Sequence, residues 1–152
     1  MDWTLFFTYF AACAAAATSG AMIQPGPWYD ALNKPTWTPP NWVFPVVWTS
    51  LYVLMSLAGM RAAQATGSGL ATALWSVQIA LNTLWTPVYF GLHRIRAALV
   101  VIGFLWLAVA ATTVALFGVD WVAGLMFVPY LIWVSIAAFL NYTTVRLNPA
   151  SA

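Results

Sequence analysis

The sequence predicts an all-α membrane protein, a bundle of five transmembrane helices with an ordered loop between the first two helices. Two observations lead to this prediction. First, 63% of the 152 residues are hydrophobic and only 5% are charged, whereas soluble domains carry about 25% charged residues. Second, the charges leave uncharged intervals at residues 3–29, 35–60, 62–92, 97–119 and 121–145. Each interval exceeds the roughly 20 residues with which a helix crosses a bilayer.

Continuous apolar runs favour helices over a β-barrel, whose strands alternate in segments of about ten residues. The N-terminus, Met1-Asp2-Trp3, lacks the basic region of a secretory signal peptide, so we expect the first helix to remain in the protein. Tight turns after the second, third and fourth helices make their neighbours antiparallel. The expected helices, within one domain over residues 1–152, lie at about 3–23, 42–63, 69–91, 96–118 and 121–147.

The connection between the first two helices has a different composition. Residues 24–41 contain five of the nine prolines, together with Trp28, Tyr29 and Trp37. Proline restricts φ, and buried aromatic rings can give a loop a small core of its own. We therefore predict an ordered lid, rich in proline and tryptophan, over one end of the bundle.

Basic residues near the helix ends predict the orientation of the chain in the membrane. Lys34, Arg94, Arg96 and Arg146 fall on one side of the five-helix arrangement, and Arg61 alone falls on the other. The positive-inside rule then places the N-terminus outside and the C-terminus inside. Long apolar helices favour an inner membrane. The formal charge of +2 is too small to indicate a nucleic-acid partner.

Helical spacing aligns aromatic and polar side chains on three faces that point into the bundle. An amide at mid-membrane depth bonds another helix or lines a site, and both readings stay open for Gln78 and Asn82. Pro87 and Pro129 are expected to kink the third and fifth helices and to open space between helices. The three faces, which together could enclose a large flat ligand, comprise Trp48, Tyr52 and Met55, then Gln78, Asn82, Trp85 and Tyr89, and finally Tyr130, Trp133, Ala137 and Asn141.

Residues for catalysis or metal binding are scarce. Cys13 and His93 are the only cysteine and histidine, and glutamate is absent. This composition excludes an intramolecular disulfide, a cysteine metal cluster and a bis-histidine haem. It also provides no Ser-His-Asp set and no pair of intramembrane carboxylates, so neither a conventional enzyme nor an ion-coupled transporter is predicted.

Two surface patterns allow two interpretations each. Small residues are spaced four apart on the first helix, at Ala12, Ala16 and Gly20. This spacing is typical of close helix packing, either within one bundle or at a homodimer interface. The fifth helix also meets a loose cholesterol-contact pattern, in which an apolar residue, a tyrosine and a basic residue follow one another. The residues of this pattern are Leu140, Tyr142 and Arg146. A tyrosine and an arginine near a membrane surface can equally serve as interfacial anchors.

Three blocks of sequence carry a resemblance to a known family. The longest is Trp28-Tyr29-x-x-Leu32-x-Lys34-Pro35-x-Trp37-x-Pro39-Pro40-x-Trp42-Val43-Phe44, and the others are Gln78-x-x-Leu81-Asn82-x-x-Trp85 and Pro129-Tyr130-Leu131-x-Trp133. In this order, the blocks resemble the TspO/MBR family of translocator proteins, also called peripheral-type benzodiazepine receptors. The short C-terminal tail resembles the bacterial members, and the resemblance allows an outer as well as an inner membrane.

The resemblance implies a dimeric five-helix protein that binds porphyrins, cholesterol and synthetic isoquinoline or benzodiazepine ligands under the first loop, with no required cofactor. Trp48 and Trp133 are similar to tryptophans implicated in light-dependent breakdown of protoporphyrin IX. Tyr142 and Arg146 are similar to sterol-contact residues, although Val145 stands where animal members often have tryptophan. The expected ligand-binding residues are Trp37, Trp48, Tyr52, Gln78, Asn82, Trp85, Tyr89, Tyr130, Trp133, Ala137 and Asn141.

Three functions follow as hypotheses. The favoured one is a tetrapyrrole- and sterol-binding protein with a regulatory or sensory role. The second is a transporter that moves the same ligands across the membrane. The third is an enzyme that degrades porphyrin in the light through its pocket tryptophans. Only the third predicts a bleached porphyrin after illumination.

Overall fold

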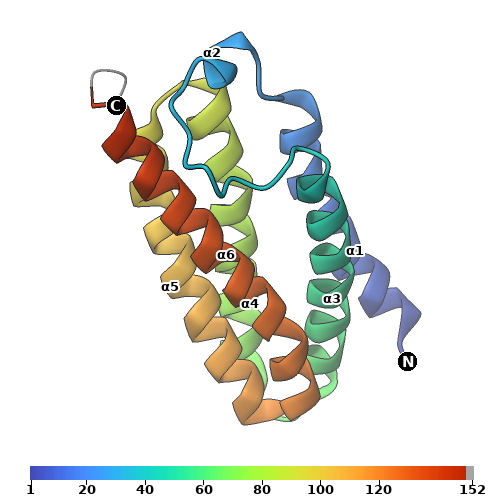
Figure 1. Cartoon of the computed structure of the whole chain (residues 1–152). Coiled ribbons are helices and arrows are strands. Elements are labelled where there is room, and N and C mark those ends of the chain that lie inside the picture. The colour runs from blue at the N-terminus through green and yellow to red at the C-terminus, as the bar shows by residue number, and fades with distance from the viewer. Residues whose placement is uncertain (150–152) are drawn as a thin grey trace.

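The computed structural model describes residues 1–149, which form six α-helices and one π-helical turn (Figure 1). Apart from the end of the third predicted helix, every helix boundary lies within one residue of the sequence prediction. The five long helices are α1 (Trp3–Met22), α3 (Val43–Gln64), α4 (Gly69–Thr86), α5 (Ile95–Val119) and α6 (Trp121–Leu147).

Four of these helices, α1, α3, α5 and α6, are long and apolar enough to cross a membrane. This is one fewer than the charge intervals predict. The exception is α4, the shortest of the five at 18 residues. Its hydropathy is diluted by polar side chains that recur along the whole helix, namely Thr72, Ser76, Gln78, Asn82, Thr83 and Thr86.

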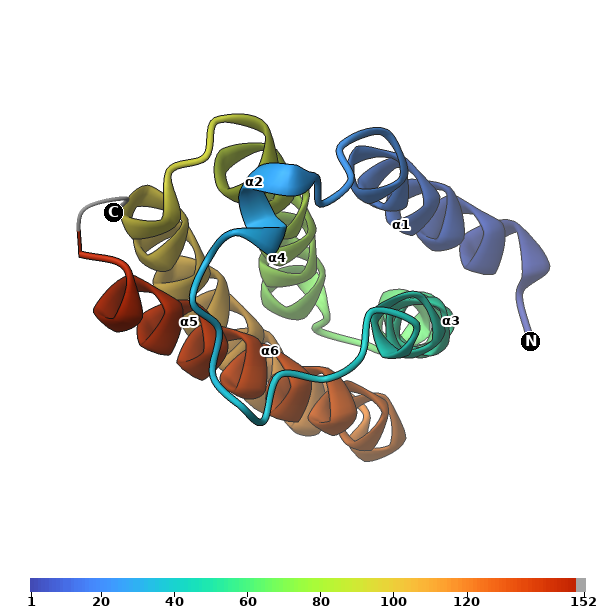
Figure 2. The same ribbon diagram turned by 45° about the horizontal axis from the view of Figure 1, so that its top comes forward.

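The long helices pack as a closed ring. α1 contacts α3 and α4, α3 contacts α6, and α5 lies between α4 and α6. The lid, the α4–α5 connection and the end of α6 lie at one end of the bundle, called the lid end here, and the α3–α4 and α5–α6 turns lie at the far end (Figure 1). Figure 2 shows the lid crossing the bundle end from α1 to α3.

The lid, residues 24–41, contains a short helix that the sequence did not predict, α2 (Pro27–Asp30). Pro27 begins this helix, where its fixed φ is favourable and its missing N–H costs little. The Lys34 ammonium group closes the other end by donating to the carbonyl oxygens of Tyr29 at 2.7 Å and Asp30 at 3.3 Å. The ring of Trp28 stacks on His93, with centroids 4.2 Å apart.

The third predicted helix changes its winding at Pro87. The α-helical part ends at Thr86, and the turn η1 (Pro87–Gly91) is π-helical. Proline removes one backbone hydrogen bond and its ring collides with the preceding turn, which wider π spacing relieves. Pro87 was expected to kink an α-helix, and the structure shows a changed winding at this position. Pro129 lies inside α6, as predicted.

An ion pair fastens the far end of the bundle. Arg61 Nη2 on α3 lies 2.8 Å from Asp120 Oδ2, which stands between α5 and α6. Asp120 Oδ1 also accepts a hydrogen bond of 2.9 Å from the backbone N–H of Ala123 and so caps α6. One carboxylate therefore holds the start of α6 and joins α3 to the α5–α6 turn.

This ion pair predicts a pH dependence of stability. Partial burial opposes ionisation of Asp120, yet the hydrogen bonds from Ala123 and Arg61 and the charge of Arg61 hold its pKa below the ordinary 3.8. A lowered folded-state pKa stabilises the fold above the unfolded-state pKa, and this contribution is lost as the pH falls through the folded-state pKa. Asp120→Asn keeps the cap but removes the charge, so we expect it to lose about 0.5–1 kcal/mol of stability at pH 7.

The measurement is thermal unfolding in detergent between pH 7 and pH 3. The stability difference between wild type and Asp120→Asn should shrink toward the acid end. Asp30→Asn is the control, because Asp30 is exposed and its side chain forms no ion pair within residues 1–149. A difference that stays constant down to pH 3 would contradict the assigned role of the Arg61–Asp120 pair.

Candidate functional site

A polar bridge joins three helices in the middle of the bundle. The hydroxyl of Tyr52 on α3 donates to Asn82 Oδ1 on α4 at 3.1 Å. Asn82 Nδ2 in turn donates to the hydroxyl oxygen of Tyr130 on α6 at 3.0 Å. Asn82 and Tyr130 are buried. Three residues that the sequence placed on three separate faces therefore meet at one point.

Aromatic rings surround this bridge on the side of α3 and α6. The ring of Trp48 lies 5.4 Å from that of Tyr52 and 6.0 Å from that of Tyr130. Phe44, in the first turn of α3, meets Trp133 edge-on at 5.7 Å. The two tryptophans that the resemblance singled out therefore lie at the α3–α6 interface, toward the lid end.

A second polar contact lies closer to the lid. The indole N–H of Trp85 on α4 donates to Asn141 Oδ1 on α6 at 3.3 Å. Asn141 Nδ2 donates to the backbone oxygen of Ile95 at the start of α5 at 3.0 Å. Tyr89 is buried and its ring lies 4.9 Å from that of Trp85. Here the polar side chains pair with each other and lock α4, α5 and α6 together.

Two buried polar groups have no partner within the part of the chain that the structure describes. They are the side-chain amide of Gln78, in which neither the nitrogen nor the oxygen is bonded, and the indole N–H of Trp133. Gln78 is 0% exposed and lies one helical turn from Asn82. Leaving a buried polar group unpaired costs about 1–3 kcal/mol. Such groups need an external partner, either a water molecule or a ligand.

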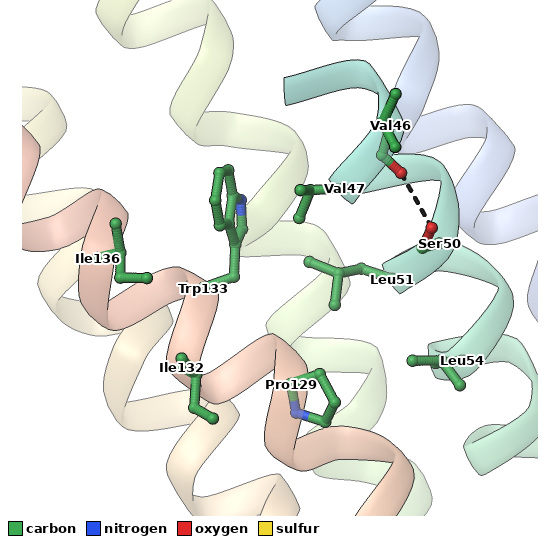
Figure 3. Close-up of a pocket in the computed structure, with 9 residues that line it drawn as sticks. All are labelled: Val46, Val47, Ser50, Leu51, Leu54, Pro129, Ile132, Trp133 and Ile136. Carbon is green, nitrogen blue, oxygen red and sulfur yellow. Dashed lines mark hydrogen bonds between the residues drawn. The ribbon is translucent and has the colours of Figure 1, made fainter. Parts of the chain in front are cut away.

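A groove of about 280 Å³ runs between α3 and α6 (Figure 3). Its walls are almost entirely apolar, with Val47 and Leu51 on α3 and Pro129 and Ile132 on α6. Trp133 forms part of the wall, and Figure 3 shows its ring reaching from α6 toward Val47. An unpartnered N–H donor therefore stands beside an apolar groove between two helices.

Comparison with known proteins identifies the family. The sequence profile of the TspO/MBR family matches residues 4–147. The chain belongs to the TspO/MBR family. A tryptophan-rich sensory protein of Cereibacter sphaeroides is 59% identical over 97% of this chain and 94% of its own length. Protein CrtK of Rhodobacter capsulatus is 54% identical over 98% and 96%. The human translocator protein is 37% identical over 80% and 75%.

Family membership and the four apolar helices make this TspO/MBR chain an integral membrane protein. Not all of the expected ligand-binding residues lie in its interior. Trp37 is exposed, and its ring stacks on Phe139 on the outer side of α6. Ala137 is half-buried and packs against the core at the lid-end half of α6.

The residues of the cholesterol-contact pattern occupy a different surface of this TspO/MBR protein. Tyr142 and Arg146 are exposed, and Arg146 Nη1 donates to the Tyr142 hydroxyl oxygen at 3.1 Å. Leu140 is half-buried. Asn141, between them in sequence, points into the bundle and is buried. The predicted porphyrin and sterol residues therefore lie on opposite sides of α6.

Sequence reasoning missed two features of the TspO/MBR chain. Asn33 of the lid and Asn148 at the end of α6 exchange two hydrogen bonds, which no spacing pattern indicates because 115 residues separate them. The second feature is a close contact between Gly59, inside α3, and the ring of Tyr9. A glycine in the middle of an apolar helix often marks such a close approach, so the sequence did contain an indication of this contact.

Proposed function

We propose that this protein binds flat lipophilic molecules of the tetrapyrrole class, with protoporphyrin IX as the representative ligand, and that binding serves a regulatory or sensory role. The unpartnered indole N–H of Trp133 beside the apolar α3–α6 groove carries this proposal. A tetrapyrrole offers a wide apolar face for the groove and polar atoms that can accept from the indole. The rings of Phe44 and Trp48 add aromatic surface on which a flat macrocycle can stack.

The size of the groove sets a condition on binding. Its volume of about 280 Å³ lies just below the range for ligand sites, about 300–1,000 Å³. A macrocycle therefore needs α3 and α6 to separate near Trp133. The buried amide of Gln78 supplies a second polar contact for a ligand that reaches the interior.

A sterol is proposed to use the outer face of α6 instead. There Tyr142 presents an exposed ring and Arg146 an exposed cation, next to the half-buried Leu140. This arrangement suits an amphipathic molecule with a polar head at the membrane surface. Synthetic isoquinoline and benzodiazepine ligands are flat and apolar, so they belong with the tetrapyrrole at the α3–α6 groove.

The membrane arrangement is part of the proposal. Together α4 and η1 span residues 69–91 and form the fifth crossing, with the amide side chains of Gln78 and Asn82 turned inward. The lid end carries Lys34, Arg94, Arg96 and Arg146, so it faces inside, with the N-terminus outside, in an inner bacterial membrane. A homodimer is retained as a proposal, but Ala16 of the small-residue stripe is buried within one chain, so this stripe supports packing inside the bundle.

The test is a dark titration of the purified protein with protoporphyrin IX, followed by tryptophan quenching. Trp48→Phe and Trp133→Phe remove one indole each, and Trp121→Phe is the matched control because Trp121 is 64% exposed at the far end. Loss of the Trp133 hydrogen bond is expected to weaken binding by about 3- to 10-fold. Trp121→Phe should bind like wild type. The proposal is wrong if binding to wild type does not saturate. It is also wrong if the Trp133→Phe and Trp121→Phe variants bind protoporphyrin IX with equal affinity.

Two further measurements separate binding from the other hypotheses. A transporter predicts flux of protoporphyrin IX into sealed vesicles that follows its concentration gradient. A light-dependent enzyme predicts a covalently altered, bleached porphyrin that appears with wild type and not with the Trp48 and Trp133 variants. Saturable binding with neither flux nor bleaching supports the binding role alone.

A further inference from the structure

A small polar hollow lies at the far end of the bundle, at the opposite end from the lid. It holds about 160 Å³ and is lined by Arg61, Gln64 and Ala65 at the end of α3 and by Asp120 between α5 and α6. This volume is several times the roughly 30 Å³ that a water molecule occupies in the liquid. It is smaller than the roughly 300 Å³ at which sites for drug-sized ligands begin. The hollow therefore has room for a compact polar group, such as a phosphate with a short substituent.

The guanidinium group of Arg61 has donors that the fold does not use. Its Nε donates to Asp120 Oδ1 at 3.3 Å, and its Nη2 lies 2.8 Å from Asp120 Oδ2. Within residues 1–149, the N–H groups on Nη1 donate to no other group. The side chain of Arg61 is 38% exposed, so it can be reached from outside the protein. A planar guanidinium group with spare donors is suited to bind phosphate oxygens.

Asp120 and Gln64 complete the polar lining of the hollow. Asp120 caps α6 through Oδ1, and its side chain remains 19% exposed, so a cation can still approach the carboxylate. Gln64 is exposed, and its side-chain amide can both donate and accept. The hollow therefore presents a positive and a negative group side by side, with no net charge.

The ends of three apolar helices place this hollow near the membrane surface. α3, α5 and α6 are long and apolar enough to cross a membrane; α3 ends at Gln64, and Asp120 separates α5 from α6. Trp121 follows Asp120 directly and is 64% exposed, while Phe117, one turn before Asp120, is 40% exposed. Exposed tryptophans are typical of the membrane–water interface. Phospholipid headgroups supply phosphate at this depth, and the two exposed rings offer an apolar surface for acyl chains.

We propose that the hollow binds the headgroup of a zwitterionic phospholipid of the phosphatidylethanolamine type. The phosphate accepts from Arg61 Nη1 and from the Gln64 amide, and the ammonium group lies against the carboxylate of Asp120. The two charges of this headgroup complement the Arg61–Asp120 pair, whereas a purely anionic headgroup meets Asp120 as a like charge. The bound lipid joins α3 to the α5–α6 turn. This site is separate from the α3–α6 groove and does not rest on the proposed function.

Native mass spectrometry of the delipidated protein in detergent tests the site by counting bound lipid molecules. The lipids are phosphatidylethanolamine, phosphatidylglycerol and a diacylglycerol with the same acyl chains. Wild type should bind phosphatidylethanolamine about two- to fivefold more tightly than phosphatidylglycerol, and diacylglycerol more weakly than either. Arg61→Gln should weaken the binding of both phospholipids about three- to tenfold, because the charged donor to phosphate is lost.

Two further variants separate lipid binding from loss of the ion pair. Asp120→Asn breaks the same ion pair as Arg61→Gln but keeps the Arg61 cation. It should therefore bind phosphatidylglycerol at least as tightly as phosphatidylethanolamine. Arg94→Gln removes an exposed cation at the lid end and should bind all three lipids like wild type. Circular dichroism and thermal unfolding confirm that each variant is folded.

Four outcomes would overturn parts of the proposal. Equal affinities for Arg61→Gln and Arg94→Gln would overturn the phosphate contact. If Asp120→Asn lost phosphatidylglycerol binding as strongly as Arg61→Gln does, the broken ion pair would account for the loss, and the phosphate contact would again be wrong. An unchanged lipid preference in Asp120→Asn would overturn the ammonium contact. A preference of wild type for phosphatidylglycerol would overturn the zwitterionic class.

A competition experiment distinguishes a lipid headgroup from a soluble phosphate. Inorganic phosphate and phosphoethanolamine are added to the complex of wild type with phosphatidylethanolamine. The lipid should remain bound at concentrations of either compound equal to its own, because the acyl chains add apolar contacts that the soluble compounds lack. Displacement of the lipid under these conditions would show that the hollow is a site for soluble phosphates.

Discussion

Replacing Gly59 by valine is expected to destabilise the protein by about 3 kcal/mol, the upper end of the range for overpacked cores. A Cβ atom at Gly59 would lie 2.6 Å from Cδ1 and 2.8 Å from Cγ of Tyr9. Because Cγ is the root of the ring, the whole side chain must turn at χ1. Tyr9 is also confined on its other side, where its ring meets Trp75 edge-on at 4.6 Å.

The effect extends over three helices. Trp75 on α4 donates its indole N–H to the Met55 oxygen on α3 at 3.0 Å, so moving Tyr9 disturbs the contact among α1, α3 and α4. Small residues at such contacts let helices approach closely, and this packing replaces the hydrophobic effect between helices in lipid. Gly59 is therefore needed where α1 joins the bundle.

Thermal or denaturant unfolding in detergent measures this effect. Gly103→Val is the control, because a Cβ at Gly103 meets nothing within 4 Å, and it should be neutral or slightly stabilising. Combining Gly59→Val with Tyr9→Ala should cost less than the sum of the two single changes, since the clash is gone. Equal losses for Gly59→Val and Gly103→Val would show that the α1–α3 contact is not tight.

The sequence was a good guide to the helices and a poor guide to their partners. Uncharged intervals and prolines predicted the boundaries because charge and proline act locally on the chain. The 3.6-residue period correctly placed Gln78, Asn82, Tyr130 and Asn141 in the interior. The period does not give the rotation of one helix against another. It could therefore not show that the Asn82 side chain has hydrogen-bond partners, whereas the Gln78 side chain has none within residues 1–149.

The lid was the least predictable part for a related physical reason. Its proline and tryptophan content predicted order, but order depends on contacts that are distant in sequence. Trp37 was expected to be a ligand-binding residue of the lid, and its ring stacks on the outer face of α6. The Asn33–Asn148 pair and the helix α2 depend on how the end of α6 lies under the loop. Such contacts follow from the packed bundle, which composition does not describe.

Replacing Asn82 by leucine is expected to lower stability by about 1–3 kcal/mol. Leucine fills a similar volume but leaves the Tyr52 hydroxyl without its acceptor and the Tyr130 oxygen without its donor. Unpaired buried groups cost about 1–3 kcal/mol each in soluble proteins. Interhelical hydrogen bonds in membranes average about 0.6 kcal/mol, with a maximum near 1.7, because the unfolded chain in lipid also finds partners. Two such bonds give the expected range.

Tyr130→Phe removes one of the two bonds and should cost about half as much, as measured by unfolding in the same detergent. Thr83→Ala is the control. Thr83 neighbours Asn82, but within residues 1–149 its hydroxyl bonds only its own helix, at the oxygen of Ile79. The double variant of Asn82→Leu with Tyr130→Phe should cost less than the sum of the single changes, since both break the same bond. Additive losses would mean that Asn82 and Tyr130 act independently. In that case we would assign Asn82 to ligand binding. Coupled losses would instead show that the main role of Asn82 is to join α3, α4 and α6 around the groove.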